Sequence, residues 1–367
     1  MQITKRCAIY KTSLPLKATI YTISFLEKRI FAVICRKKEE NGKGSGHLIA
    51  KERKKSDKII KLEAALGRLP LDHFKRQLLE QELRNRLKGY RGEQSLDYHL
   101  SFLPNKEYII LHDLRLSNGT FFFQIDTLII TPQVIIILEI KNLSGTLFFD
   151  RDTKQLIQTN HEGKEKGYPD PLIQVMKQRM QLQQWINQNL SINPPIEHFV
   201  VISDPSSILK TNPGNHLIFK RICHSAVIVN FILDLKNKHM EVVLTSKSIK
   251  KLTNLLIKHN VPLHVDILQN FGIPKEDIIT GALCSSCSLT VLQYKQCNWS
   301  CPKCGGKFKD AHINATHDYF LLINPTITNQ KLREFLHISS RSVSLRILNS
   351  MNLSYYGDGK GRLYFLP

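Results

Sequence analysis

The sequence predicts an α/β fold whose core has the order helix, three strands, helix, strand. Apolar residues recur with helical spacing over residues 58–103, and from residue 108 the spacing changes to that of β-strands. Asn118-Gly119 and Pro132-Gln133, two pairs that are typical of turns, separate the strand-like segments. Together these observations predict helices followed by strands that tight turns connect.

The helical part begins near Lys58 and continues, after a break at Pro70, to Leu87. A second helix is predicted over residues 92–103. The three strands that follow are rich in β-branched and aromatic residues, as strands are. They cover residues 108–114, 120–131 and 134–141.

Two short strands, a helix and a buried strand complete the predicted core. The short strands cover residues 145–149 and 155–159. Pro169-Asp170-Pro171 then begins a helix that continues to Leu190, because proline is well placed in the first turn of a helix. Pro194-Pro195 ends this helix, and residues 196–202 are apolar enough for a buried strand.

The chain is strongly basic. Its 367 residues include 52 Lys and Arg against 31 Asp and Glu, which gives a formal net charge of +21. Such an excess indicates a polyanionic partner, and DNA, RNA and an anionic membrane surface all fit it. Residues 1–57 carry much of the excess and include the flexible stretch 41–46, so they are predicted to be a basic, poorly ordered extension. A nucleic-acid-binding arm is the alternative.

The sequence predicts a cytoplasmic protein without a membrane span. No run of eighteen apolar residues occurs, although a transmembrane helix needs about 20. Residues 18–26 are moderately apolar, but the charged residues 27–29 follow where a signal peptide would have a small-residue cleavage site. Five of the eight cysteines lie between Cys284 and Cys304, which indicates a metal site in a reducing compartment and not a disulfide framework.

Acidic residues interrupt two of the apolar strands. Glu139 and Lys141 lie on one face of their strand because side chains alternate, and Asp126 lies within the preceding strand. If these strands pair through the Pro132-Gln133 turn, Asp126 and Glu139 are cross-strand neighbours about 5 Å apart at Cβ. Two carboxylates this close repel each other unless a cation such as Mg²⁺ lies between them. Lys141 would then orient or deprotonate a metal-bound water, or neutralise charge on a phosphate. An ion pair at the strand end would explain one acid and one base, but not the second acid.

This pattern resembles a known nuclease signature. Asp126 followed by Glu139-x-Lys141 resembles the PD-(D/E)xK motif, and further motifs are similar to those of the nuclease-related domain, NERD. The similar motifs are Gly92-Glu93, Gln124-Ile125-Asp126, Leu138 to Asn142 followed by Gly145, and Gln174. The resemblance covers residues 88–205 and implies a restriction-endonuclease-like αβββαβ core that uses Mg²⁺ or Mn²⁺. One departure is that no proline precedes Asp126.

The resemblance also implies catalytic roles for Glu93 and Gln174. Glu93 would be a further acid that supports the metal or its water. The alternative is that Glu93 is an ordinary glutamate at a helix N-terminus, where the helix dipole favours a negative charge. Gln174 lies at helical spacing from Gln178 and Gln181, and would approach the metal or the DNA. A solvated polar helix face is the alternative for this group.

Two CxxC pairs predict a zinc site. Cys284 and Cys287 are separated by thirteen residues from Cys301 and Cys304, and two such pairs can complete a tetrahedral site. The arrangement resembles a zinc ribbon. A site closed by four thiolates is structural, since it leaves no position for catalysis. Cys297 is surplus, although it could replace Cys301 as a ligand.

The C-terminal segment resembles a helix-turn-helix with a small basic wing. Two short helices are joined by residues 337–340, of which Ser340 is a suitable N-cap. Ser342 and Ser344 are expected to face outward together with Arg341 and Arg346, the candidate nucleic-acid-binding residues. A plain helical hairpin with a β-turn would explain the same pattern.

The sequence therefore predicts a nuclease-like protein that hydrolyses phosphodiester bonds in DNA, with Asp126 and Glu139 as Mg²⁺ ligands and Lys141 positioning the attacking water. A non-catalytic nucleic-acid-binding scaffold on the same fold is the alternative, and an RNA-processing factor would share the basic surface and the ribbon. The predicted segments are the extension 1–57, a helical lead-in 58–87, the nuclease-like domain 88–205, an α/β continuation 206–280, a zinc ribbon 281–310 and the helix-turn-helix-like segment 325–367.

Overall fold

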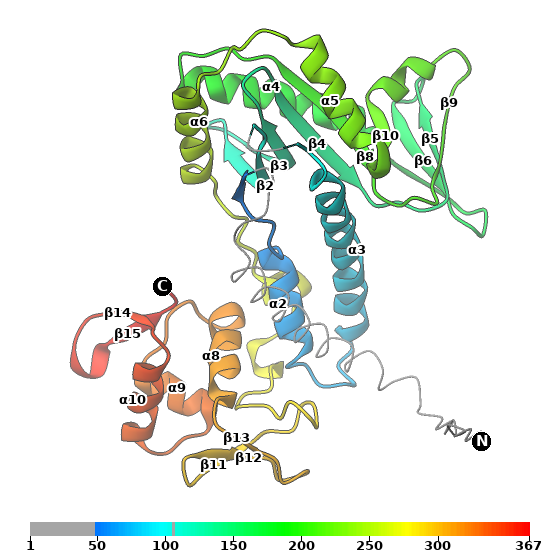
Figure 1. Cartoon of the computed structure of the whole chain (residues 1–367). Helices are drawn as coiled ribbons and strands as arrows, with labels where there is room; N and C mark the ends of the chain where they lie inside the picture. Colours follow the sequence, from blue (N-terminus) through cyan, green and yellow to red (C-terminus); the bar gives the residue numbers. More distant parts are fainter. Residues whose placement is uncertain (1–47, 105–106) are drawn as a thin grey trace, which may run out of the picture. The chain divides into compact units, whose positions relative to one another are not determined.

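A six-stranded mixed sheet is the centre of the fold in the computed structural model, which describes residues 48–104 and 107–367 (Figure 1). The middle strands β2, β3 and β4 are antiparallel, whereas β1 joins β2, β8 joins β4 and β10 joins β8 in parallel. In spatial order the strands are β1 (Leu48–Lys51), β2 (Ile109–Ser117), β3 (Phe122–Ile130), β4 (Ile135–Lys141), β8 (Ile196–Ile202) and β10 (Ile222–His224).

Helices cover both faces of this sheet. Helices α3 (Arg76–Leu100) and α5 (Ile228–Lys238) contribute apolar side chains to one hydrophobic cluster, and α4 (Pro171–Asn189) and α6 (Ser246–Lys258) contribute to the other (Figure 1). Strands β4 and β8 are buried along almost their whole length, as central strands covered on both sides are. The order α3, β2, β3, β4, α4, β8 confirms the predicted αβββαβ core.

The N-terminal part differs from its prediction over residues 48–57. These residues were expected to belong to a poorly ordered extension, but Leu48–Lys51 form β1 and Ser56 caps α2 (Asp57–Leu66) by accepting the N–H of Ile59. The basic run that suggested disorder includes Arg53, whose charge is compensated by acids far away in the sequence. The remainder of the predicted extension, residues 1–47, lies outside the described residues.

Helix α3 is continuous from Arg76 to Leu100, although a break between residues 87 and 92 was predicted. Glu93 therefore lies in the interior of a helix, and the helix-dipole explanation for this residue does not apply. α3 is the longest helix of the described residues, at 25 residues. Neither it nor any other described helix has the length and apolar content that crossing a membrane requires.

A second sheet follows β4 and leads the chain toward α4. Its four strands have the order β7-β6-β5-β9, and Leu147, Phe149 and Leu156 bury their side chains in the cluster on the α4 face. The sequence predicted β5 and β6, but not the more polar β7 and β9. The strands are β5 (Thr146–Asp150), β6 (Gln155–Thr159), β7 (Glu165–Pro169) and β9 (Ile208–Thr211).

Ion pairs connect β8 to the elements that follow it. Glu197 on β8 lies 2.9 Å from Nε2 of His239 and 2.8 Å from Nζ of Lys238, and it also contacts Arg221. Burial would raise the pKa of Glu197, but the hydrogen bonds from Lys238, His239 and Arg221 outweigh it and lower the pKa to about 2. These contacts link the C-terminal end of α5 to the sheet.

The C-terminal third combines a small sheet with three helices and a hairpin around one core. Trp299, Tyr319, Phe335, Leu348 and Tyr364, which come from all these parts, belong to one hydrophobic cluster. The predicted ribbon and helix-turn-helix segments therefore share a core. The elements are β11 (Gln293–Lys295), β12 (Asn298–Ser300), β13 (Lys307–Phe308), α8 (Ala311–Leu322), α9 (Asn329–Leu336), α10 (Arg341–Ser350), β14 (Ser354–Tyr356) and β15 (Leu363–Phe365).

Candidate active site and metal centre

Asp126 and Glu139 lie on adjacent strands in the register that the sequence predicted. Thr127 on β3 pairs with Leu138 on β4, so Asp126 and Glu139 occupy the next position along the two strands. The Oδ2 atom of Asp126 accepts the N–H of Ile140 at 2.9 Å. Glu139 is only 2% exposed, which is costly for a carboxylate unless partners compensate its charge.

Side chains from α4 and β4 surround the carboxylate of Glu139. Its Oε1 accepts hydrogen bonds from Nζ of Lys141 and from Nε2 of Gln174, each at 2.7 Å. Its Oε2 accepts one from Nε2 of Gln178 at 2.7 Å. Lys141 also donates to Oε1 of Gln174 at 2.9 Å. Gln174 and Gln178 therefore point into the site and fix the orientation of Glu139, so the alternative of a solvated polar face does not describe them.

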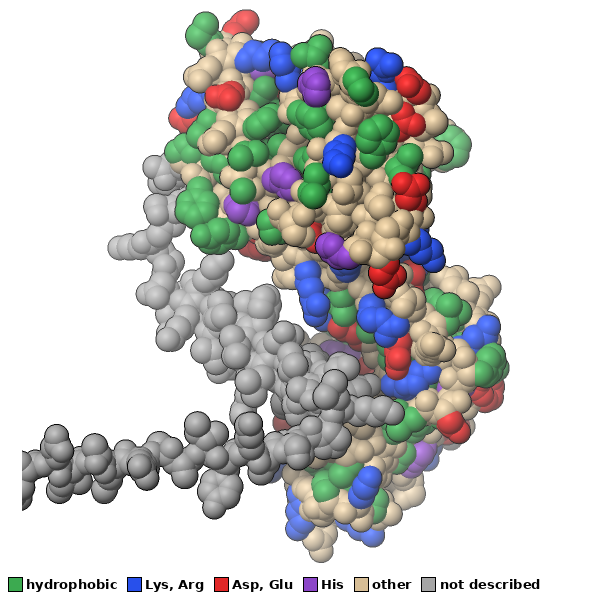
Figure 2. Space-filling model, turned by 90° about the vertical axis from the view of Figure 1, so that its right-hand side faces the viewer, with side chains coloured by type: hydrophobic (Ala, Val, Ile, Leu, Met, Phe, Trp, Pro, Cys, Tyr) green, Lys and Arg blue, Asp and Glu red, His purple; other side chains and the backbone are tan. Residues whose placement is uncertain are grey.

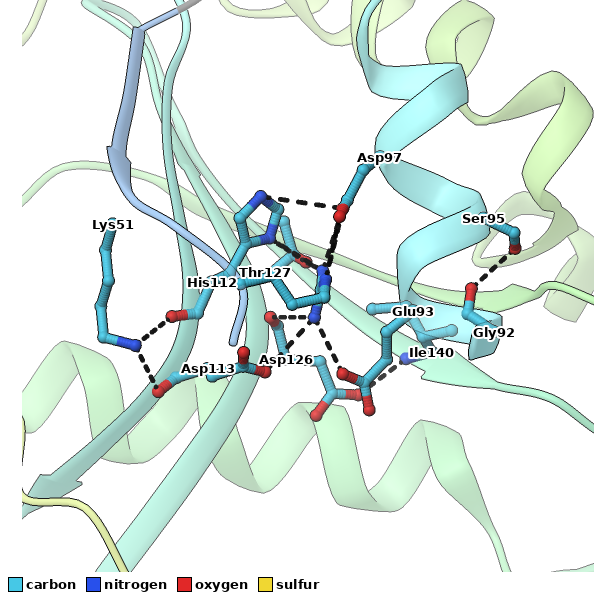
Figure 3. Close-up of polar contacts among 11 residues, drawn as sticks. Lys51, Gly92, Glu93, Ser95, Asp97, His112, Asp113, Asp126, Thr127 and Ile140 are labelled. Carbon is cyan, nitrogen blue, oxygen red and sulfur yellow. Dashed lines mark hydrogen bonds and ion pairs between the residues drawn. The ribbon is translucent and has the colours of Figure 1, made fainter. Parts of the chain in front are cut away.

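Glu93 on α3 is the third acid of this group. Figure 3 shows its carboxylate directed toward the same space as that of Asp126. Burial raises the pKa of Glu93 to about 7, with repulsion from Asp113 and Glu139 adding to the effect and Arg53 opposing it. Burial and the charges of Glu139 and Glu93 raise the pKa of Asp126 well above its usual value. The three carboxylates are thus near enough to repel one another.

The chemistry of these donors suits a divalent cation, although among the described residues only the four cysteines have their ligand atoms already gathered as a bound ion requires. Asp126, Glu139 and Glu93 offer carboxylate oxygens, which are the ligands that Mg²⁺ and Mn²⁺ prefer. A cation among them would relieve the repulsion that raises the pKa of Asp126. Lys141 and Gln174 complete the set of five residues that the sequence proposed as catalytic, and the structure brings all five together.

A close approach of α3 to the end of β4 positions Glu93. A Cβ atom added to Gly92 would lie 2.4 Å from Cβ of Asn142 and 2.6 Å from Oγ of Ser203. Only glycine therefore allows the helix to lie this close to the strand. Packing therefore requires a glycine at position 92, inside the continuous helix.

We expect Gly92→Ala to lower the stability of the domain by about 1–3 kcal/mol, because the new methyl group forces α3 away from Asn142. Gly89→Ala is the matched control: it lies in the same helix and has open space at its Cβ. Alanine there should stabilise the helix by about 0.5–1 kcal/mol. Urea unfolding of the two variants measures the difference, and equal effects would contradict the assigned role of Gly92.

Several polar residues of the site were not predicted from the sequence. Arg53, Asp97, His112 and Asp113 form a network next to Glu93. Lys51 donates to the carbonyl oxygens of His112 and Asp113, as Figure 3 shows. His112 and Asp113 interrupt an apolar strand in the same way as Asp126, so this signal could have identified them. Arg53 offers no local signal, since it lies in a run of charged residues.

The four cysteines of the CxxC pairs come together as predicted. The sulfur atoms of Cys284, Cys287, Cys301 and Cys304 all lie within 4.8 Å of one another, an arrangement that fits a bound metal ion. Cys297 is exposed in the turn between β11 and β12 and is not a member of this group. The alternative in which it replaces Cys301 therefore has no support.

The C-terminal helices and hairpin follow one another in the order expected for the winged helix-turn-helix-like segment: α9, a short turn, α10, β14 and β15. Ser340 caps α10, as predicted, and Arg341 and Arg346 are exposed on that helix. Ser344, which was expected to face outward, is fully buried instead. Its hydroxyl donates a hydrogen bond to the carbonyl oxygen of Asn329 on α9. Binding of nucleic acid by Arg341 and Arg346 stays a prediction. On the face shown in Figure 2, basic and acidic side chains are interspersed and form no single basic patch.

Residues 88–203 match the family model of the nuclease-related domain, NERD. The matched range agrees with the predicted 88–205 and contains Glu93, Asp126, Glu139, Lys141 and Gln174. The predicted nuclease-related domain is thus confirmed, whereas the cysteine cluster and the winged helix lie outside the match. No curated protein and no solved structure gives a significant match to the chain.

Proposed function

We propose that residues 88–203 hydrolyse phosphodiester bonds in DNA with a divalent cation, Mg²⁺ or Mn²⁺, held by Asp126 and Glu139. The observation that carries this proposal is the placement of Asp126 and Glu139 beside Lys141 on adjacent strands, with Glu93 of α3 close enough to repel them. Such repulsion costs stability in the absence of a cation, so a purely structural role would not account for it. The match to a nuclease-related domain supports phosphodiesters as the substrate class.

Each residue of the site has a separate role in the proposed hydrolysis. A bound cation would supply Lewis-acid stabilisation of the phosphate and lower the pKa of a water. Lys141, whose Nζ lies 2.7 Å from Glu139, would orient the attacking water and stabilise the charge that develops on the phosphate. Gln174 and Gln178 hold the carboxylate of Glu139 in place through their amide N–H groups. Glu93, whose carboxylate is directed toward the same space as that of Asp126, would support the metal ion or its water.

The test is a cleavage assay on the full chain with labelled single- and double-stranded DNA and RNA, with Mg²⁺, with Mn²⁺ and without an added divalent cation. We expect cleavage of DNA only when a divalent cation is present. Binding without cleavage under every condition would favour the non-catalytic scaffold. Cleavage of RNA alone would favour an RNA-processing enzyme and overturn DNA as the substrate.

We further propose that the winged helix binds DNA through α10. Arg341 and Arg346 are exposed on this helix, and α10 contains no acidic residue. In the adjoining hairpin the guanidinium of Arg362 lies 4.3 Å from the ring centroid of Tyr355, so the hairpin also presents a cation. A helix with exposed arginines beside a basic hairpin suits a DNA groove and its flanking phosphates.

Replacing Arg341 and Arg346 with Ala is expected to weaken DNA binding and to make its salt dependence shallower. If both contact phosphates, the slope of log K against log salt should fall by about 2. Lys55→Ala with Lys236→Ala is the control, because these ammonium groups already pair with Glu63 and Glu107. Fluorescence anisotropy at several salt concentrations measures the slopes, and an unchanged slope in the arginine variant would contradict the proposal.

The four-cysteine cluster is proposed to hold one structural Zn²⁺. Four sulfur ligands close a tetrahedral zinc site and leave no position for a substrate. Thiolate ligands also agree with the reducing cytoplasmic location that the cysteine distribution predicts. The role of this ion would be to stabilise the core that the ribbon and the winged helix share.

A further inference from the structure

Arg53 forms ion pairs with three carboxylates beside the candidate metal site. Its side chain is 3% exposed, although it comes from the short segment between β1 and α2. Its Nη1 lies 2.9 Å from Oε2 of Glu93 and 3.3 Å from Oδ1 of Asp113. Its Nε lies 3.1 Å from Oδ2 of Asp97. The guanidinium therefore contacts Glu93, which belongs to the proposed catalytic group, and also Asp97 and Asp113, which do not.

The remaining donors of Arg53 are also engaged. Nη2 donates to Oγ1 of Thr127 at 2.8 Å and contacts Nδ1 of His112 at 2.8 Å. Because a guanidinium has no acceptor, Nδ1 of His112 accepts in this contact. With every nitrogen of the guanidinium bonded in this way, Arg53 cannot contact a substrate without breaking the network. It acts through Glu93 and is a positioning residue.

Acidic side chains outnumber basic ones around this point. Five acids gather here, against three lysine and arginine side chains. Such an excess of acids favours the binding of a further cation. The acids are Glu93, Asp97, Asp113, Asp126 and Glu139, and the cations are Lys51, Arg53 and Lys141.

Asp113 supplies a ligand atom that the described network does not use. It lies between two paired positions, His112 with Thr127 and Leu114 with Ile125, which places it opposite Asp126. Its Oδ2 is buried and has no hydrogen-bond partner among the described residues. A buried carboxylate oxygen without a partner is costly, and a metal ion is one group that could use it.

We propose that Arg53 is a fixed cation in the place of a second divalent ion, so that the site holds one metal ion. Glu93 and Asp113, which Arg53 now bridges through Nη1, would hold the second ion in its absence. Two-metal sites have ions about 3.5–4 Å apart, a separation that neighbouring carboxylates span. This inference rests on the proposed function, since it requires a metal ion at Asp126 and Glu139.

Titration of the full, zinc-loaded chain with Mn²⁺, followed by the electron paramagnetic resonance signal of free Mn²⁺, tests the inference. We expect one bound Mn²⁺ in the wild type, two in Arg53→Met and one in Arg53→Lys, which keeps the charge. Arg221→Met is the control, because it removes an arginine from the carboxylate of Glu197 elsewhere on the sheet. It should leave the number of bound Mn²⁺ at one. Adding Asp113→Asn to Arg53→Met should return the number from two to one.

The outcomes separate this inference from the proposed function. A wild type that binds no Mn²⁺ overturns the proposed metal site and the role of Arg53 together. One Mn²⁺ in both the wild type and Arg53→Met leaves the metal site standing and overturns the role of Arg53. If Arg53→Met does not fold alone, Mn²⁺ added during refolding should restore it with two ions bound. Failure of Mn²⁺ to restore it, while the double variant folds, would make Arg53 a structural ion-pair partner only.

Discussion

Replacing Asp126 with Asn is expected to abolish cleavage while leaving the cation-free protein at least as stable as the wild type. Asn has nearly the same volume, and its Oδ1 can still accept the N–H of Ile140. Losing a metal ligand removes Lewis-acid stabilisation worth several kcal/mol, so the cleavage rate should fall by about 10²–10⁴-fold. Losing the charge also removes the repulsion from Glu139 and Glu93 that raises the pKa of Asp126.

The stability effect of this substitution should depend on pH. The pKa of Asp126 is higher in the folded than in the unfolded chain, so folding favours the protonated carboxyl. The stability from this group is complete below the ordinary aspartate pKa of about 4 and is lost as the pH rises through the folded value. Without divalent cations, the wild type should therefore lose stability from pH 4 upward, and Asp126→Asn should lose less.

Thermal unfolding from pH 4 to pH 8, in buffer freed of divalent cations but with zinc still bound, measures this difference. Added Mg²⁺ should raise the unfolding temperature of the wild type more than that of Asp126→Asn. Asp152→Asn, an exposed aspartate in the same domain, should resemble the wild type in unfolding and in cleavage. A variant that cleaves normally but unfolds more easily would show that Asp126 is a structural residue.

The acid–acid–lysine group could be predicted because its geometry is local. Asp126 and Glu139 lie on strands joined by a tight turn at Pro132-Gln133, and a short turn fixes the register of the strands it connects. The strands themselves are long apolar runs, so an acid within one of them is conspicuous. The same reasoning applied to the strand over residues 109–117 would have identified Asp113.

Arg53 could not be predicted because its partners are distant in the sequence. Its hydrogen-bond partners lie 40 to 74 residues further along the chain, and they meet it only after β1 pairs with β2. The segment around Arg53 is a run of charges, which by itself is typical of a solvated extension. Tertiary contacts overrode that local preference, as they did at Gly92, where packing against Asn142 replaced the expected helix break.

The shared core of the C-terminal third could not be predicted from local sequence patterns either. The two CxxC pairs predicted the cysteine cluster, since their spacing alone specifies how four sulfurs can meet. Trp299 of the ribbon, however, is buried among residues of α8, α9 and α10, and nothing in its neighbourhood in the sequence indicates those partners. Because the ribbon and the three helices share this core, removal of the metal ion should destabilise both.

Replacing Cys301 and Cys304 with Ser is expected to release zinc and to unfold the winged helix together with the ribbon. Zinc binding contributes about 10–16 kcal/mol to small zinc domains, because the metal affinity is also folding free energy. Cys284 and Cys301 are buried in the same cluster as Tyr319, Phe335 and Leu348. Loss of the ion should therefore disrupt the packing of α8, α9 and α10 and abolish the part of DNA binding that α10 supplies.

Zinc content, hydrogen exchange and DNA binding measure the three parts of this prediction. Cys297→Ser is the matched control, because Cys297 is exposed and lies outside the cluster; it should keep one zinc and normal exchange rates. The two hydrophobic clusters on either side of the six-stranded sheet contain no residue of the C-terminal third. Amide protons of β4 and β8 should therefore remain protected in the double variant while those of α8 to α10 exchange quickly. Protection of α8 to α10 without zinc would show that their apolar core is stable on its own and that the ion fixes only the ribbon.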